Sequence, residues 1–317
     1  MLFVTLHGGK PEKNPHKNNV HAYDKDGNRL TPSVLDDCEN ICLNELRALT
    51  FVRNHLYVVN ANKEENSVLC YEGSGTTYKY VSTFVSSQTC NSILHPFDIT
   101  FDGLDYCYLS NQDTNVVTRL IVSKDGKSAR PAPLPASLPR AGRFLQGTFV
   151  ASSKGDLPPQ VNTPVQAPAG LEYYGPKFTT DKKHSVRGVV WVNGNLYTVD
   201  QPAGTVKVYD ISGRYVGQSN AVESPVHVVV HNQTLFVSGG DQVLASPLPS
   251  PAGDFRLLPV KGLKVKNSSG MAFSNSGNFY VASRTENVIL KFDSNFRPVK
   301  FRCELPDNPE FLLHVPV

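Results

Sequence analysis

The chain has 317 residues, of which 40% are hydrophobic and 19% charged, and its formal net charge is +3. A chain of this length can bury a large core, and repetitive all-β folds of this size form single domains. The small net charge and the scattered Lys and Arg residues argue against a nucleic-acid partner, and no apolar run approaches the ~18 residues that a membrane-spanning helix needs.

A unit of two apolar strands joined by a tight turn recurs along the chain. Its copies lie at 49–51 with 56–60, 99–101 with 108–111, 189–191 with 196–200, 228–230 with 235–238, and 271–273 with 279–283. Third strands follow at 66–71, 115–120, 205–210 and 287–293. A weaker fourth strand closes each unit. Four antiparallel strands repeated about every 40–45 residues are typical of a β-propeller.

The two ends of the chain complete the ring. Residues 1–6 read as a second strand and 19–24 as a third, while 309–314 match the missing first strand. The sequence therefore predicts an all-β, six-bladed β-propeller over residues 1–317, in which the N- and C-terminal strands share one blade and leave no open sheet edge. The alternative is seven blades, because Phe149 lies at blade-like spacing in the segment 131–186.

The segment 131–186 is rich in Pro, Gly and Ala, and we expect it to be an insertion that caps the central pocket. It lies on one predicted face of the propeller together with the other long connections, at 7–18, 31–45 and 86–95. The turns of the opposite face are mostly tight. Because binding groups are usually carried by long loops over a rigid scaffold, we expect the functional site on the face with the long connections.

The repeated units resemble those of NHL-repeat propellers and their relatives, which include the gluconolactonase family, strictosidine synthase-like proteins, virginiamycin B lyase and the peptidylglycine amidating lyase. In the gluconolactonase-like group, acidic and amide side chains before the first strands hold a central calcium. The corresponding positions here are Arg47, Phe97, Arg187, Val226, Ser269 and Glu310. One carboxylate beside two guanidiniums does not suit a cation that needs 6–8 oxygen ligands, so the sequence disfavours a calcium lactonase.

The amidating lyase implies a zinc site built from histidines of several blades. The histidines of this chain do not occupy equivalent positions in successive blades, so a three-histidine zinc site is not expected. We therefore predict no metal and no cofactor, with zinc and calcium as the alternatives.

The predicted mouth of the channel collects Arg, His and Glu side chains. We assign catalytic roles to His227, His95 and Glu310, and substrate binding to Arg47, Arg187, His7, His184, Asn111 and Asp200. Two Arg side chains could clamp a carboxylate, phosphate or phenolate, and a His could act as general acid or base. The alternative is structural: Arg47 and Arg187 pair with Glu310 or Asp200 and close the channel.

These residues predict an enzyme that acts on a small anionic or polarised organic molecule in a capped central pocket, by His acid–base chemistry and Arg charge stabilisation. It would be a lyase, a hydrolase or a cyclisation step of secondary metabolism. The alternative is a non-catalytic NHL-type scaffold that binds protein or RNA on one face, for which residues 10–17 form the one basic cluster.

We further expect a monomer whose partner is a small-molecule ligand in the central channel, with no membrane partner. Residues 1–6 lack the features of a signal peptide, which favours a cytoplasmic location. Secretion would require that a signal peptide had been removed, and it would allow one disulfide among the six cysteines.

Overall fold

The computed structural model describes residues 1–7, 18–36, 41–103, 105–112, 116–132, 185–211, 213, 215–248 and 254–316, together with four short strands between residues 144 and 173. The elements in this part of the chain are β-strands. Within it, no helix is long and apolar enough to cross a membrane. The five cysteines described, which leave out Cys38, are free thiols.

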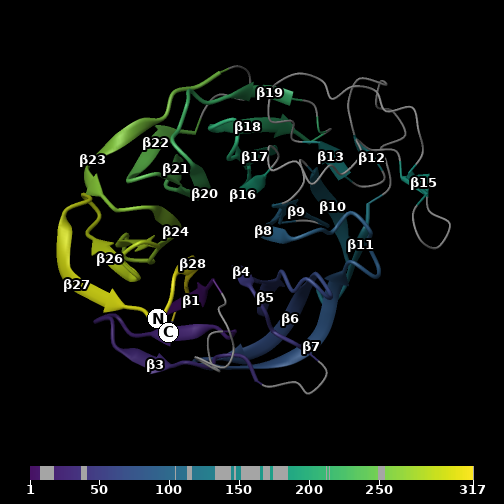
Figure 1. The fold of residues 1–317 in the computed structure, drawn as a ribbon, viewed down its shortest axis with the longest axis horizontal. Coiled ribbons are helices and arrows are strands. Elements are labelled where there is room, and N and C mark those ends of the chain that lie inside the picture. The colour runs from purple at the N-terminus through teal and green to yellow at the C-terminus, as the bar shows by residue number, and fades with distance from the viewer. Residues whose placement is uncertain are drawn as a thin grey trace.

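Six of the seven sheets in the described part of the chain are blades arranged around a central axis, and the seventh is a two-stranded pair in the segment 131–186 (Figure 1). Blade 1 contains β28 (Pro309–His314), β1 (Leu2–Leu6), β2 (His21–Tyr23) and β3 (Arg29–Thr31), from the axis outwards. Blade 2 contains β4 (Leu46–Val52), β5 (His55–Asn60), β6 (Ser67–Ser74) and β7 (Thr77–Ser86). Blade 3 contains β8 (Pro96–Phe101), β9 (Tyr106–Asn111), β10 (Val116–Val122) and β11 (Ala129–Pro131).

The remaining blades follow in chain order. Blade 4 contains β16 (Val186–Val192), β17 (Asn195–Asp200), β18 (Thr205–Asp210) and β19 (Tyr215–Gln218). Blade 5 contains β20 (Pro225–His231), β21 (Thr234–Gly239), β22 (Gln242–Pro247) and β23 (Leu258–Lys264). Blade 6 contains β24 (Ser268–Phe273), β25 (Phe279–Ser283), β26 (Val288–Phe292) and β27 (Pro298–Glu304). The predicted six-bladed, all-β propeller is thus the fold of the chain.

The two ends of the chain meet in blade 1, where N and C lie side by side in Figure 1. β28 pairs antiparallel with β1, with Phe3 opposite Leu313 and Val4 opposite Leu312. The backbone N–H of Val315 also donates to the carbonyl of Met1 over 2.9 Å. Inter-strand hydrogen bonds between the first and last strands therefore close the ring.

The seven-blade alternative is wrong, because Phe149 belongs to the sheet of blade 3. It lies in β13 (Thr148–Val150), which pairs with β10 and with β12 (Phe144–Leu145). The other strands in the segment are β14 (Val165–Gln166) and β15 (Glu172–Tyr173), which pair with each other. Most of the predicted cap at 131–186 lies outside the described residues, so its capping role stays a prediction.

A β-bulge interrupts the inner strand of every blade close to the residue at which that strand begins. The register shifts lie between Leu46 and Leu49, Pro96 and Ile99, Val186 and Val189, Pro225 and His227, and Ser268 and Met271, and in blade 1 opposite Thr5 and Leu6. An extra residue in one strand bends that strand and redirects its side chains. The six bulges therefore set the direction of the side chains that line the channel.

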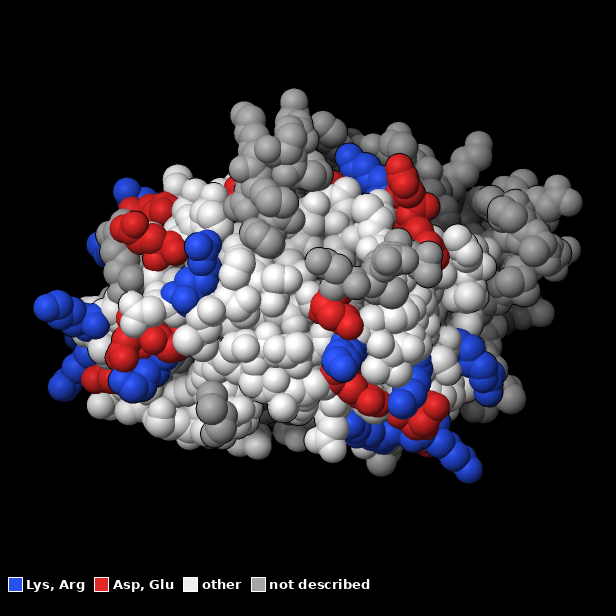
Figure 2. All heavy atoms as spheres, turned by 90° about the horizontal axis from the view of Figure 1, so that it is seen from below, with Lys and Arg blue, Asp and Glu red and all other residues white. Residues whose placement is uncertain are grey.

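Charged side chains are mixed in sign on the side of the molecule that Figure 2 shows. Lys and Arg lie next to Asp and Glu around its edge, with uncharged residues between them. The described residues on this side thus form no patch of a single charge.

Candidate functional site

The channel has two ends of different character. Inner strands begin at the end that carries the connections between blades, which we call the loop face. They end at the hairpins that lead into the second strands, which we call the hairpin face. Arg47, Phe97, Arg187 and Glu310 lie near the loop-face ends of their strands.

Six polar side chains converge at the loop face. This loop-face cluster consists of His7, Glu45, Arg47, His95, Arg284 and Glu310. They come from the ends of β1 and β25, from the residue before β8, and from the beginnings of β4 and β28. Strands of four blades therefore have to be in place before the cluster exists.

Glu310 is the centre of the cluster and is 1% exposed. Its Oε1 lies 2.7 Å from His7 Nδ1, 2.8 Å from Arg284 Nη2 and 3.4 Å from Arg47 Nη1. Burial by itself raises the pKa of Glu310, but the hydrogen bond with His7 and the charges of Arg47 and Arg284 outweigh it, so the pKa lies below its ordinary value. Glu310 is therefore an ionised carboxylate held in a fixed position.

Arg47 links Glu310 to Glu45 and His95 on the other side of the cluster, and it is 2% exposed. Its Nη2 donates to Glu45 Oε2 over 3.1 Å and lies 3.3 Å from His95 Nε2. His95 Nε2 is also 3.3 Å from Glu45 Oε2. The predicted structural pairing of Arg47 with Glu310 is thus present, and it fixes the guanidinium rather than leaving it open for a ligand.

His7 is more exposed than its partner Glu310, with 42% of its side chain accessible. Its Nδ1 is 2.7 Å from both Glu310 Oε1 and Arg47 Nη1. An Nδ1–H donates to the carboxylate, and an Nδ1 lone pair accepts from the guanidinium, so either tautomer has a partner. Nε2 remains for a ligand, as a hydrogen-bond acceptor and base in the first tautomer and as a hydrogen-bond donor in the second.

The cationic surroundings of Glu310 decide which ligands fit. Two guanidiniums and an imidazole occupy the side of the carboxylate that a divalent cation would need. Among the described residues, no group of three or more His, Cys, Asp or Glu side chains is arranged to hold a metal. The donor set suits a polarised or anionic organic molecule better than a hard cation.

Other residues predicted for the site have different surroundings. Arg187 donates from Nε to Gln201 Oε1 over 2.6 Å, and its guanidinium stacks 5.0 Å above the centre of the Phe97 ring. Asp200 forms an ion pair with Lys207 (3.0 Å between Oδ2 and Nζ), and both side chains are 1% exposed. Asp200 therefore has a buried structural partner.

Asn111 is fully buried and holds a turn together. Its Nδ2 donates to the carbonyl of Val116 over 3.1 Å, and its Oδ1 accepts from the N–H of Leu94 over 2.9 Å. A ligand in the channel cannot reach a side chain that is used in this way. His184 lies outside the described residues.

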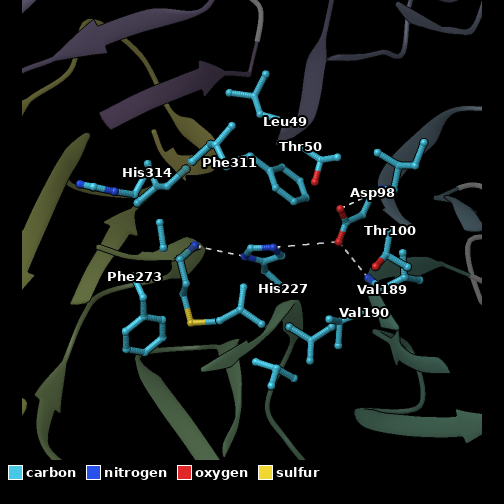
Figure 3. A pocket seen from close by; sticks show the side chains of 18 residues that line it. Leu49, Thr50, Asp98, Thr100, Val189, Val190, His227, Phe273, Phe311 and His314 are labelled. Carbon is cyan, nitrogen blue, oxygen red and sulfur yellow. Dashed lines mark hydrogen bonds and ion pairs between the residues drawn. The ribbon is translucent and has the colours of Figure 1, made fainter. Parts of the chain in front are cut away.

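His227 does not join the loop-face cluster. It faces a cavity of about 280 Å³ in the hairpin-face half of the channel, opposite Asp98 (Figure 3). Phe311, which directly follows Glu310 in β28, lines this cavity, and its ring lies 5.2 Å from that of Phe97. The sequence thus identified a channel residue, but placed it at the wrong end of the channel.

Comparison with known proteins yields structural similarity only. No family model matches the chain, and no curated protein matches its sequence. The chain is similar to a chain of a nidogen/laminin complex, at 12% identity and TM-score 0.58, with 98% of this chain and 96% of that chain covered. It is similar to a protein from Lactobacillus plantarum, at 14% identity and TM-score 0.58, with 94% and 80% covered. It is also similar to the periplasmic gluconolactonase of Pseudomonas aeruginosa, at 16% identity and TM-score 0.54, with 96% and 82% covered. These similarities show the fold alone.

The sequence analysis did not name Glu45, Asp98 or Arg284 as site residues. Arg284 directly follows β25, the second strand of blade 6, just as His7 directly follows β1, the second strand of blade 1. This shared position could have identified Arg284 from the sequence. Asp98 follows Phe97 at the bulge of β8, as His227 follows Val226 at the bulge of β20. Aligning the blades one residue further would have found Asp98. Glu45, two residues before Arg47, carried no such signal.

Proposed function

We propose that this protein is an enzyme that hydrolyses a small lactone or ester at the loop-face cluster, with His7 as the acid–base group. The observation that carries the proposal is the 2.7 Å contact between His7 Nδ1 and the buried carboxylate of Glu310. In the tautomer whose Nδ1–H donates to this carboxylate, the ring is held in place and Nε2 can act as a general base, as in many hydrolases. Glu310 acts here as a positioning residue.

In the proposed reaction, His7 Nε2 takes a proton from water as the water oxygen bonds to the carbonyl carbon. The carbonyl oxygen becomes an oxyanion in the tetrahedral intermediate, and the guanidinium of Arg284, whose side chain is 21% exposed, stabilises it. The ring C–O bond then breaks, and the imidazolium returns its proton to the leaving oxygen. Lactone and water thus give a hydroxy acid.

The charges of the cluster favour a polarised or anionic substrate. Arg47 and Arg284 bring two positive charges within 3.4 Å of one carboxylate oxygen, while Glu45 compensates part of the charge of Arg47. One structurally similar protein is named a gluconolactonase, which makes sugar lactones the first substrates to try. Among the described residues, Glu310 Oε1 has His7, Arg47 and Arg284 as its neighbours, and these surroundings favour a reaction at His7.

The experiment measures proton release during hydrolysis of D-glucono-1,5-lactone and 4-nitrophenyl acetate by the whole chain. We expect His7→Gln to lower kcat by about 100-fold or more, which is the usual contribution of a general base. His231→Gln is the matched control, because His231 stacks on Phe273 at the hairpin end of β20. It should leave the rate unchanged.

Two outcomes would contradict the proposal. One is a wild-type protein that accelerates neither reaction, which would favour the scaffold alternative. The other is a His7→Gln variant that folds as the wild type does and keeps its rate, which would mean that another group performs the proton transfer.

A further inference from the structure

The hairpin-face half of the channel contains a second pocket. Its cavity of about 280 Å³ is lined by residues of all six inner strands (Figure 3). Phe311 belongs to its lining, and its buried ring packs on the buried ring of Phe97. The partly exposed Thr50, Thr100 and Phe273 lie at its opening to solvent. No residue of the loop-face cluster lines the cavity, so the two sites are separate.

Most of the lining is apolar, with Val, Leu, Ile, Met and Phe side chains between the strands. The polar exception in its deep part is the facing pair Asp98 and His227, which are 6% exposed each. They occupy equivalent positions at the bulges of β8 and β20. A small number of polar groups in an apolar cavity is typical of a site that orients a small ligand.

The hydrogen bonds of His227 determine where its proton lies. Nδ1 accepts the backbone N–H of Met271 over 3.1 Å, so the proton of the neutral ring is on Nε2. Burial lowers the pKa of His227 to about 3, so the ring is neutral at pH 7. Nε2 is 4.0 Å from Asp98 Oδ2, which is too far for a hydrogen bond. Nε2–H therefore points at Asp98 across a gap.

Asp98 is held by the backbone alone. Oδ1 accepts from the N–H of Ile99 over 2.8 Å, and Oδ2 accepts from the N–H of Val189 over 2.9 Å. Burial outweighs these two hydrogen bonds and raises the pKa of Asp98 to about 8. The pair is therefore uncharged at pH 7.

We propose that this cavity binds a small, uncharged, mainly apolar molecule through one hydroxyl or carbonyl oxygen seated between His227 Nε2 and Asp98 Oδ2. An oxygen about 2.8 Å from each atom spans the 4.0 Å gap with two ordinary hydrogen bonds. An apolar cavity of roughly 150 Å³ already takes up benzene, so a single substituted ring fits here. The site is independent of the proposed lactonase reaction, which takes place at the other end of the channel.

Calorimetric titration of the whole chain at pH 7 with benzyl alcohol, toluene and benzoate tests the proposal. Benzyl alcohol carries the hydroxyl oxygen, and toluene lacks it. We expect the dissociation constant of benzyl alcohol to be about tenfold lower than that of toluene, the equivalent of one good hydrogen bond. Benzoate should not bind, because the apolar cavity offers its charge no counter-ion.

Two variants identify the atoms involved. His227→Asn keeps an acceptor for Met271 N–H but lacks Nε2–H, so it should weaken benzyl alcohol about tenfold and leave toluene unchanged. Thr50→Trp narrows the opening and should abolish binding of both. The proposal is overturned if no probe binds at millimolar concentration, or if benzyl alcohol and toluene bind equally in the wild type. Equal weakening of both probes by His227→Asn, with an unchanged melting temperature, would also overturn it.

Discussion

Two carboxyl groups of the channel differ in charge although both are buried. Glu310 has His7, Arg47 and Arg284 around its Oε1, so its pKa lies below the ordinary value. Asp98 has only two backbone N–H donors, so burial raises its pKa to about 8. Pairs of acids whose surroundings separate their pKa values in this way have different chemical roles. In the proposed hydrolysis Glu310 positions a base, whereas Asp98 is a neutral hydrogen-bonding group at pH 7.

The raised pKa of Asp98 makes the stability of the fold depend on pH. The folded protein keeps this proton up to about pH 8, while the unfolded chain loses it near pH 3.8, so the stabilisation is complete below pH 3.8 and is lost as the pH rises through 8. His227 has the opposite effect: its pKa falls from 6.5 to about 3, so its contribution is complete above pH 6.5 and is lost as the pH falls towards 3. Between pH 6.5 and 8 the slope from Asp98 is therefore not offset by His227.

We expect Asp98→Asn to remove this slope. In the wild type, the Asp98 carboxyl makes the free energy of unfolding fall by up to about 1.4 kcal/mol for each unit that the pH rises between 6.5 and 8. Urea unfolding at half-unit steps of pH measures it, with Asp26→Asn as the control because the Asp26 side chain is 62% exposed. Parallel pH curves for the wild type and Asp98→Asn would show that Asp98 is ionised in the folded protein.

The sequence predicted part of the site at the level of single residues. His7, Arg47, His95 and Glu310 were named from their places relative to the strands, and the fold brings them together. His227 faces the other end because the bulge of β20 determines its direction, and a bulge cannot be read from hydrophobic alternation. Lys207, the partner of Asp200, was not predicted, because a lysine is rarely buried and the alternation of a strand carries no sign of an ion pair.

At the level of elements, the inner three strands were readable in every blade except blade 5, whose third strand β22 was not named, and the outer strands were not located. β5 is buried along its whole length, and its middle residues 56–59 form one apolar run that the sequence shows. β23 is exposed at five of its seven positions, with Val260 intermediate and Leu263 buried, so it lacks any apolar pattern. An outer strand packs on few neighbours, and its sequence therefore reflects solvent rather than the fold.

Close approach of neighbouring blades depends on glycine at two of the bulges. A Cβ at Gly270 would lie 2.7 Å from Phe311 Cα and 2.8 Å from the carbonyl oxygen of Glu310. A Cβ at Gly188 would lie 2.8 Å from the backbone nitrogen of Val228. Backbone atoms cannot yield as a side chain can, so alanine at either position has to push two inner strands apart.

We expect Gly270→Ala to destabilise the fold by about 1–3 kcal/mol and to lower any activity that depends on Glu310. Gly103→Ala is the control, because its Cβ meets no atom within 4 Å and only its φ of +81° opposes alanine, at a cost of about 1 kcal/mol. Chemical unfolding compares the two. A smaller loss for Gly270→Ala than for Gly103→Ala would mean that β24 and β28 separate easily.

At the level of the whole molecule, the site depends on the closed ring. The inner strands contact one another in the order β4, β8, β16, β20, β24, β28 and back to β4. His7 and Glu310 come from blade 1, Arg47 from blade 2 and Arg284 from blade 6. These residues are far apart in the sequence, and only the strand pairing that joins the two ends brings them within hydrogen-bond distance.

The ring therefore requires β28 but does not require the chain to begin at residue 1. We expect a chain of residues 1–308 to lose cooperative thermal unfolding, because β1 would have an open edge and the channel would lose Glu310 and Phe311.

A circular permutant tests whether the chain has to begin at residue 1. In this permutant a short glycine linker joins residue 317 to residue 1, and the chain opens at Gly75. Gly75 is exposed in the turn between β6 and β7, and no atom lies within 4 Å of the position of its Cβ. The permutant should melt within about 5 °C of the wild type, a shift of roughly 3 kcal/mol for a chain of this size. If the truncated chain instead unfolds cooperatively at the wild-type temperature, five complete blades suffice for the fold, and the pairing of β1 with β28 serves the site rather than the stability of the ring.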